Sequence, residues 1–555
     1  MSKIICLMLV FTALSTLSSQ EFTPQAASRI DAVYEKVWTE RNIAPASVSS
    51  DAEFLRRIYL DLTGRIPTEI QAREFLDSRD AGKRPALIRT LLNSKEYADY
   101  FASLYTNQFL GPKKDRFVDR HAFHDWLAEQ FHKNTGWDKI ASSLIVAEGN
   151  LAEDPALNWY VKQKLDAANL ADDTARLFLG IQLGCARCHN HPHDQWKLED
   201  FYGLAAFYSG LQRDKLGFIE RRKARDLRDD RKELIEKYKG KLENLDPATK
   251  ANLKQKMMQQ NDQIREILRL SQDQSTTIST EIAGQTKTYP AKFLLTLQPA
   301  HLQRSKREEL ARWVISTENP FFAKAFVNRI WGQLMGKGFV EPVDDLSSLN
   351  TPSNPELLEF LASDFENHRY DIKHLLYAIT NSRIYQLSSG GTHQESPKEY
   401  ETGKVVMLNA DQLLNSFMNA TSIENVLRQL NRRDYEDKLD LIYRYHVFLF
   451  DNDDNQGSSV DFRGTIPQAL FMMNGKMTNE AVRPHLANTA ARVLSASKDT
   501  EQRVERLFLC TLSRQPQRDE LDKVLAYIRN AKSEKDAYED VFWSLLNSNE
   551  FMFNH

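Results

Sequence analysis

The sequence lacks the features that mark several large functional classes. Its 73 basic and 76 acidic side chains almost cancel and leave a formal net charge of -3, so there is no positive excess with which to bind nucleic acid. It has no Gly-rich phosphate loop, no nucleophile elbow and no His-Glu-x-x-His motif, so the common kinase and hydrolase chemistries have no support. Strand-like alternation of apolar and polar residues is nearly absent. These absences predict a mainly α-helical protein without a nucleic-acid partner.

Long apolar runs are absent except at the start of the chain. Lys3 precedes an apolar run over residues 4–14 and a small-residue stretch over residues 15–19, which is the layout of a secretory signal peptide. The run is shorter than the roughly 20 residues needed to span a bilayer. We therefore expect a signal peptide over residues 1–19 and an exported protein, periplasmic or extracellular, with no membrane span after the signal is removed.

Cysteine is scarce. Of the 4 cysteines in the chain, those that follow the predicted signal peptide are Cys185, Cys188 and Cys510. Cys510 ends an apolar run over residues 507–510, so we expect it to be a buried and inert thiol. The other two lie in the histidine-rich segment 184–194 (GCARCHNHPHD). We expect the function of the chain to be organised around this segment.

Cys185, Cys188 and His189 form a Cys-x-x-Cys-His motif, which has the spacing for covalent attachment of haem c. The two thiols add to the vinyl groups and the next imidazole faces the iron. The motif therefore predicts a c-type haem protein with a role in electron transfer or periplasmic oxidation, served by an unknown redox partner. The candidates for a sixth iron ligand are His121, His124, Met335, Met407 and Met418.

The same atoms permit two other interpretations. Cys185 and Cys188 with His191 and either His189 or His193 have the donor set of a tetrahedral zinc site, because alternate residues of an extended segment point the same way. The two thiols can instead close a disulfide without any metal. Under either alternative the protein is a non-catalytic scaffold or binding protein, with a structural metal or disulfide at the motif.

Helical patterns fill a first domain over residues 22–210. Ser50 caps a helix whose apolar residues recur at three and four positions, and Gly64 stops it. Thr68 and Gln71 then form a capping-box pattern. Further helices are expected over residues 83–92, 97–109, 122–131 and 137–147. A helix over residues 167–183 is expected to deliver the cysteine motif, with Gly184 as its exit.

Residues 211–272 change character, because basic and acidic side chains alternate along two helical stretches joined by a turn at residues 244–247. We expect a charged helical hairpin there, with solvated faces held by its own apolar seam; a partner-docking arm is the alternative. A short strand pair is predicted at residues 276–282 and 285–289. Helices then return in a second domain over residues 273–555. The fold class predicted is mainly α: two helical domains joined by the hairpin and a short β element.

Three further groups each allow a functional and a structural interpretation. Asp344 and Asp345 with Asn328 and Arg329 form either a polar site or an Arg–Asp pair that fixes a loop. The acidic loop at residues 451–457 misses the EF-hand pattern, so we expect a solvated loop rather than a calcium site. The aromatic residues after the motif form either a haem wall or plain core. They are Trp196, Phe201, Tyr202, Phe207 and Tyr208.

Several motifs resemble those of a known family. Residues 180–192 (GIQLGCARCHNHP), with the residues that follow to position 203, resemble the planctomycete-type cytochrome c-like domain of the second class. Residues 57–67 (RIYLDLTGRIP) resemble the opening signature of that domain. Segments between residues 319 and 551 resemble the planctomycete-specific domain of unknown function that usually follows it. The resemblance implies an exported protein with a haem-like motif, and it implies no reaction or substrate. Relatives often have an aromatic residue where His193 stands.

Overall fold

The structure is a computed structural model. It describes residues 25–111, 115, 117–213, 246–267, 269–282, 284–296, 298–390, 399–423, 475–484 and 488–555, and isolated positions at 227, 230, 234, 237, 238 and 473. The predicted signal peptide, most of the first stretch of the predicted charged hairpin and the acidic loop at residues 451–457 lie outside the described residues.

The chain is mainly α-helical, as the sequence predicts. The helices before residue 210 are α1 (Gln25–Glu40), α2 (Asp51–Thr63), α3 (Glu69–Asp77), α4 (Lys83–Leu92), α5 (Lys95–Leu110), α6 (Arg120–His132), α7 (Trp137–Val146), α8 (Leu157–Lys162), α9 (Ala167–Leu179), η1 (Gly184–Arg187), α10 (Leu198–Ala205) and η2 (Ala206–Tyr208). Those that follow are α12 (Pro247–Ile267), α13 (Lys306–Val314), α14 (Phe322–Met335), α15 (Pro355–Asn367), α16 (Ile372–Thr380), α17 (Ala410–Thr421), α21 (Lys476–Val482), α22 (Thr489–Ala496), α23 (Thr500–Leu512), α24 (Arg518–Asn530), α25 (Glu534–Leu546) and α26 (Asn549–Met552).

The described strands are short and antiparallel. The predicted strand pair is confirmed as β4 (Thr277–Ile282) and β5 (Gln285–Pro290), in which Ile278 pairs with Tyr289. A three-stranded sheet has the order β1-β3-β2, and its strands are β1 (Gly149–Asn150), β2 (Leu211–Arg213) and β3 (Arg269–Gln272). The last pair joins β6 (Val406–Met407) to β7 (Phe553–Asn554), close to the end of the chain.

Local capping chemistry sets the helix ends where the sequence predicts them. Ser50 accepts a hydrogen bond from the backbone N–H of Glu53 at the start of α2, and Gly64 ends that helix with φ 63°. Glycine adopts this left-handed conformation without a Cβ clash. Thr68 and Gln71 form the predicted capping box at the start of α3. These helix ends could be predicted from the sequence because each depends on residues within one turn of helix.

The prediction of one helix over residues 167–183 is wrong at its C-terminal end. α9 ends at Leu179, because Gly180 adopts φ 62° and closes the helix with an αL cap. A Cβ at position 180 would lie 3.1 Å from Cβ of Ala325 and 3.2 Å from Cδ1 of Leu346, so α14 and the loop after it need a glycine there. The cysteine motif consequently follows a four-residue connection, 180–183, and does not continue α9.

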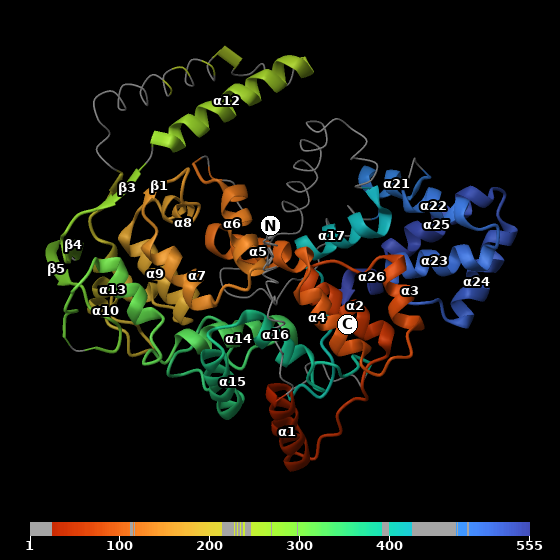
Figure 1. Cartoon of the computed structure of the whole chain (residues 1–555), viewed down its shortest axis with the longest axis horizontal. Coiled ribbons are helices and arrows are strands. Elements are labelled where there is room, and N and C mark those ends of the chain that lie inside the picture. Colours follow the sequence, from red (N-terminus) through yellow and green to blue (C-terminus); the bar gives the residue numbers. More distant parts are fainter. Residues whose placement is uncertain are drawn as a thin grey trace, which may run out of the picture.

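The apolar side chains gather in two cores. The first combines residues of α1 to α10 with residues of α13 to α16. The second is built mainly by α17 and the C-terminal helices α21 to α26, which lie together at one end of the molecule (Figure 1). α2 and the turn after it contribute side chains to both cores. Phe54 and Ile58 belong to the first core, while Leu60 and Ile66 belong to the second. The predicted domain boundaries themselves stay a prediction.

α12 forms the second stretch of the predicted charged hairpin and lies along one edge of the molecule (Figure 1). Charged and amide side chains recur throughout its 21 residues. In the described part of the chain, no helix combines the length and the apolar character that crossing a membrane demands.

A buried ion pair joins α2 to residues near position 400 and to the end of the chain. Nζ of Lys404 donates to Oδ1 of Asp61 at 2.8 Å and to the carbonyl oxygen of Gln333 at 2.8 Å. Tyr385 Oη and Asn554 Nδ2 each donate to the same Asp61 carboxylate, also at 2.8 Å. The side chains of Lys404 and Asp61 are only 5% and 2% exposed. Breaking such a pair leaves an uncompensated buried charge.

Replacing Lys404 with methionine should therefore lower the free energy of unfolding by about 3–5 kcal/mol, since Asp61 would lose its cationic partner. Urea denaturation of the full chain measures this. The matched control is Lys36→Met, whose side chain is 71% exposed in an ion pair with Glu40 and should change stability by less than about 1 kcal/mol. Equal stability of the two variants would contradict the structural role of the Asp61–Lys404 pair.

Candidate functional site

The cysteine motif starts on η1, a single 3-10 turn between α9 and α10; Cys188 is the residue that caps this turn and His189 follows it. Three apolar side chains hold the backbone in place, because Ile181, Leu183 and Ala186 are buried in the first core. The residues between them point outward, and both Cys185 and Cys188 are exposed, free thiols. The local pattern of apolar and polar residues thus fixes the turn and presents the two thiols on the surface.

His189 is exposed and has a defined tautomer. Its Nδ1 lies 2.7 Å from the carbonyl oxygen of Asn190. A carbonyl oxygen only accepts hydrogen bonds, so Nδ1 carries the proton and Nε2 keeps its lone pair. Imidazoles that bind metals commonly have this arrangement, in which a second hydrogen bond orients the ring. The geometry therefore leaves Nε2 of His189 available as a metal ligand.

The two other histidines of the segment occupy a tight loop. The backbone N–H of His191 donates to the carbonyl oxygen of Trp196 at 2.8 Å, and the N–H of His193 donates to Nδ1 of His191 at 3.3 Å. Among the residues that the structure describes, no three ligand atoms from Cys185, Cys188 and these histidines lie within 4.8 Å of one another. A four-ligand zinc site at the motif would therefore require the loop to rearrange.

The five aromatic residues offered as a haem wall are all buried, and they pack on protein. Tyr202 stacks on Tyr289 with ring centroids 5.2 Å apart, and its hydroxyl donates to the carbonyl oxygen of Arg187 at 3.1 Å. Phe207 stacks on Phe293 at 4.9 Å. These contacts favour the interpretation as core. Tyr202 has an additional role, because its hydroxyl braces the backbone of the cysteine motif.

The loop that follows α14 lies directly against the motif. The backbone N–H of Leu346 donates to the carbonyl oxygen of Gly180 at 2.7 Å. Nε2 of Gln182 donates to Oδ1 of Asp344 at 3.3 Å, and the hydroxyl of Ser348 donates to Oδ1 of Asp194 at 3.0 Å. The structure thus joins the cysteine segment to the acidic pair at residues 344–345, although more than 140 residues separate them in sequence.

Asn328 and Arg329 are adjacent on α14. Asn328 holds the loop after this helix, and Arg329 contacts the end of α9. Nδ2 of the fully buried Asn328 donates to the carbonyl oxygens of Val340 and Val343 at 3.0 Å each, and its Oδ1 accepts from the N–H of Val340. Arg329 is buried and donates to the carbonyl oxygen of Leu177 at 3.0 Å, in the last turn of α9. Burial lowers the pKa of its guanidinium, and the Asp344 charge opposes that shift. The loop after α14 is therefore fixed by the amide of Asn328, whereas Arg329 donates to backbone carbonyl oxygens of α9 and not, in the described contacts, to Asp344 or Asp345 as the Arg–Asp interpretation expects.

Carboxylates crowd together beside the motif. Burial raises the pKa of Asp172, the charges of Asp173 and Asp344 add to the shift, and the charges of Arg176 and Arg187 oppose it. Burial likewise raises the pKa of Asp345, with repulsion from Asp194 and Asp344, while His191 and a hydrogen bond from Asn350 oppose the shift. Like charges held close together disfavour the ionised forms of one another.

The candidate sixth ligands have separate environments. Met335 is buried in the first core, and Met418 is buried on α17 beside the C-terminal helices. Met407 lies in β6. Nε2 of His124 lies within hydrogen-bond distance of Ser103 Oγ and of the Asp99 carbonyl oxygen, and His121 is exposed on α6. None of these observations selects a sixth ligand.

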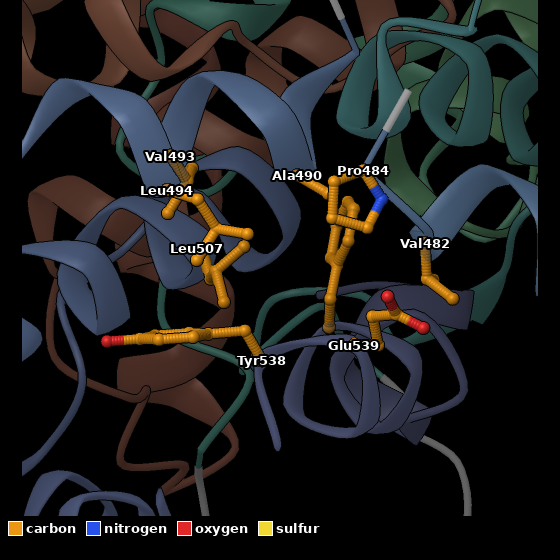
Figure 2. A pocket seen from close by; sticks show the side chains of 9 residues that line it. Val482, Pro484, Ala490, Val493, Leu494, Leu507, Tyr538 and Glu539 are labelled. Atoms are coloured by element: carbon orange, nitrogen blue, oxygen red, sulfur yellow. The ribbon is translucent and has the colours of Figure 1, made fainter. Parts of the chain in front are cut away.

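Cys510 is buried on α23, as the sequence predicts, and burial raises its thiol pKa to about 12. An apolar pocket lies beside this helix (Figure 2). Figure 2 shows Tyr538 and Glu539 of α25 facing side chains of α21, α22 and α23. Its lining contains none of the cysteines or histidines of the motif, so we do not assign the function to it.

The sequence analysis did not identify one group of possible metal ligands. Ligand atoms of Asp364, His368 and His374 come within 4.8 Å of one another at the junction of α15 and α16. The signal was present, because Asp364 and His368 are four residues apart and therefore share one helix face.

Comparison with known proteins identifies two segments of the chain. Residues 29–213, which include the cysteine motif, match the family described as PSCyt2, protein of unknown function (DUF1549). Residues 306–436, which include α14 and the loop that carries Asp344 and Asp345, match the family described as PSD1, protein of unknown function (DUF1553). These two planctomycete-type domains of unknown function occur in the order that the resemblance implied. No curated protein and no solved structure matches the chain.

Replacing Asp172 with asparagine should stabilise the protein at neutral pH. A carboxyl whose pKa is raised on folding opposes folding above its unfolded pKa, and this penalty disappears when the group is protonated in both states. The gain in melting temperature of Asp172→Asn over the wild type should therefore shrink as the pH falls toward about 4.

The control for this prediction is Asp522→Asn on α24, at an exposed position, which should leave the melting temperature unchanged across the same range. Thermal melts between pH 4 and pH 8 make the comparison, about 4 being the unfolded pKa of aspartate. If Asp172→Asn lowers the melting temperature at neutral pH, the carboxylates do not repel one another as described.

Proposed function

We propose that the protein is an exported c-type haem protein, with a role in electron transfer or a periplasmic oxidation. The observation that carries this proposal is the hydrogen bond made by Nδ1 of His189. Its Nδ1 is committed to the carbonyl oxygen of Asn190 at 2.7 Å, which leaves Nε2 free, and the thiols of Cys185 and Cys188 are exposed on the same short turn. This is the donor set that a covalently attached haem requires.

The chain's own residues fit the attachment of such a group. Cys185 and Cys188 would hold it by thioether bonds, and His189 would be the proximal ligand. The buried Ala186 between the thiols and the Tyr202 hydrogen bond to Arg187 keep the turn in place. A bound haem supplies reversible one-electron chemistry. The backbone carbonyl oxygen of Asn190 would orient His189 toward it.

The carboxylates beside the motif add an electrostatic contribution to the proposed site. Asp194, Asp344 and Asp345 lie next to the motif, and the hydrogen bonds of Gln182 and Ser348 hold two of them there. Fixed negative charge near a redox centre favours its more positively charged state. The proposal thus gives the second matched domain a purpose, which is to place carboxylates beside the motif carried by the first.

Spectroscopy after export tests this proposal. The full chain with its leader is produced in a host that attaches haem, and haem that survives acid-acetone extraction is measured as the pyridine haemochrome. The wild type should carry one haem per chain. Cys185→Ser with Cys188→Ser should carry none, since both thioether bonds are lost. Cys510→Ala is the matched control, because its thiol is buried away from the motif, and it should keep the haem.

Two results would overturn the proposal in distinguishable ways. A colourless wild-type protein that contains zinc, lost in the double cysteine variant, would assign a structural metal site to the motif. A colourless protein without metal and without free thiols at these positions would assign a disulfide. In both cases the protein would be a scaffold or binding protein.

A further inference from the structure

A second group of metal-type ligands lies at the junction of α15 and α16, which are adjacent in the molecule (Figure 1). One ligand atom from each of Asp364, His368 and His374 lies within 4.8 Å of the others. Asp364 and His368 are at the end of α15, and His374 is in the first turn of α16. In the part of the chain that the structure describes, no other set of three meets this distance.

The geometry is close to that of ligands around one ion. Nε2 of His374 lies 2.8 Å from Oδ2 of Asp364. Two ligands that are each about 2.1 Å from an ion are roughly 3 Å apart when adjacent and roughly 4 Å apart when opposite. The rings of His368 and His374 stack with centroids 3.7 Å apart and 17° between their planes. Coordination of one ion by all three residues therefore requires the imidazole of His368 to turn out of this stack, so that its Nε2 faces the other two ligands.

The hydrogen bonds of His368 prepare it as a ligand. Its Nδ1 lies 2.7 Å from the carbonyl oxygen of Asp364, so Nδ1 carries the proton and Nε2 keeps its lone pair. A backbone carbonyl bound to the second ring nitrogen is a frequent partner of metal-binding histidines. At His374, an ion between the imidazole and the carboxylate would take the place of the proton that they share.

The backbone holds the ligands together before any ion arrives. Asp371 accepts a hydrogen bond from the N–H of His374 at 2.9 Å and another from Nδ2 of Asn134 at 2.8 Å. The two residues of the turn, Arg369 and Tyr370, have φ values of 56° and 57°, a left-handed conformation that is costly for residues other than glycine. A framework that is already ordered reduces the entropy cost of binding.

We propose that Asp364, His368 and His374 bind a divalent transition-metal ion of the zinc class. Two imidazoles and one carboxylate suit zinc and its neighbours, whereas calcium and magnesium prefer sets of oxygen ligands. The side chain of His368 is 41% exposed, while Asp364 and His374 are 17% and 6% exposed. The ion thus enters from the His368 side, where water completes its coordination, and it links α15 to α16.

Metal titration of the full-length exported protein, stripped with a chelator, tests the site. Zn²⁺ binding is measured by competition with a chromogenic chelator, and Co²⁺ serves as a spectroscopic probe. The wild type should bind cobalt with weak d–d bands and without the intense charge-transfer absorption of a cobalt–thiolate bond. His368→Ala should weaken Zn²⁺ binding at this site on the order of 100-fold, because loss of a direct ligand costs at least as much as loss of its hydrogen-bond partner.

The matched control is His301→Ala, which removes another exposed histidine and should leave Zn²⁺ affinity unchanged. Asp364→Asn keeps a hydrogen-bond acceptor for His374 but removes the charge, and it too should weaken binding. A thermal shift on adding Zn²⁺ should occur in the wild type and in the double variant Cys185→Ala with Cys188→Ala. The proposal is overturned if His368→Ala binds as tightly as the wild type, or if all cobalt absorption is of thiolate character.

Discussion

The candidate site depends on two neighbouring side chains buried on α14. Asn328 satisfies three backbone groups of the loop over residues 340–343, and Arg329 donates to carbonyl oxygens in the last turn of α9. Buried backbone groups need such partners. Because the two residues are adjacent on one helix, the loop after α14 and the helix before the cysteine motif are fixed relative to each other. The second matched segment thereby holds the acidic residues of its loop beside the cysteine motif of the first.

This support explains how an exposed motif can keep a defined shape. The thiols and the imidazole lie on the surface, but the turn that carries them rests on buried apolar residues, on the hydroxyl of Tyr202 and on the N–H of Leu346. The nearby carboxylates repel one another, and the pKa values of Asp172 and Asp345 are raised. Carboxylates that are buried beside the cysteine motif and near one another cost stability at that place, as groups at functional sites commonly do.

The sequence predicted those features that depend on near neighbours. The caps of α2 and α3, the bounds of α4 and the strand pair β4–β5 follow from residues within a few positions. The end of α9 was missed although Gly180 is a local stop signal that closes the helix with an αL cap; only its close packing on Ala325 and Leu346 depends on distant segments. The cysteine motif was found because it is contiguous. Its proximity to Asp344 and the cluster of Asp364, His368 and His374 required tertiary structure, since turns and packing bring those residues together.

The proposed function requires a covalent bond between the cysteine motif and a haem. Mass spectrometry of the exported protein tests that bond most directly. The peptide that contains Cys185, Cys188 and His189 should carry the added mass of one haem, and fragmentation should place it on the two cysteines. A peptide of unmodified mass, or one lighter by two hydrogens as in a disulfide, from a host that attaches haem to other proteins would contradict the account.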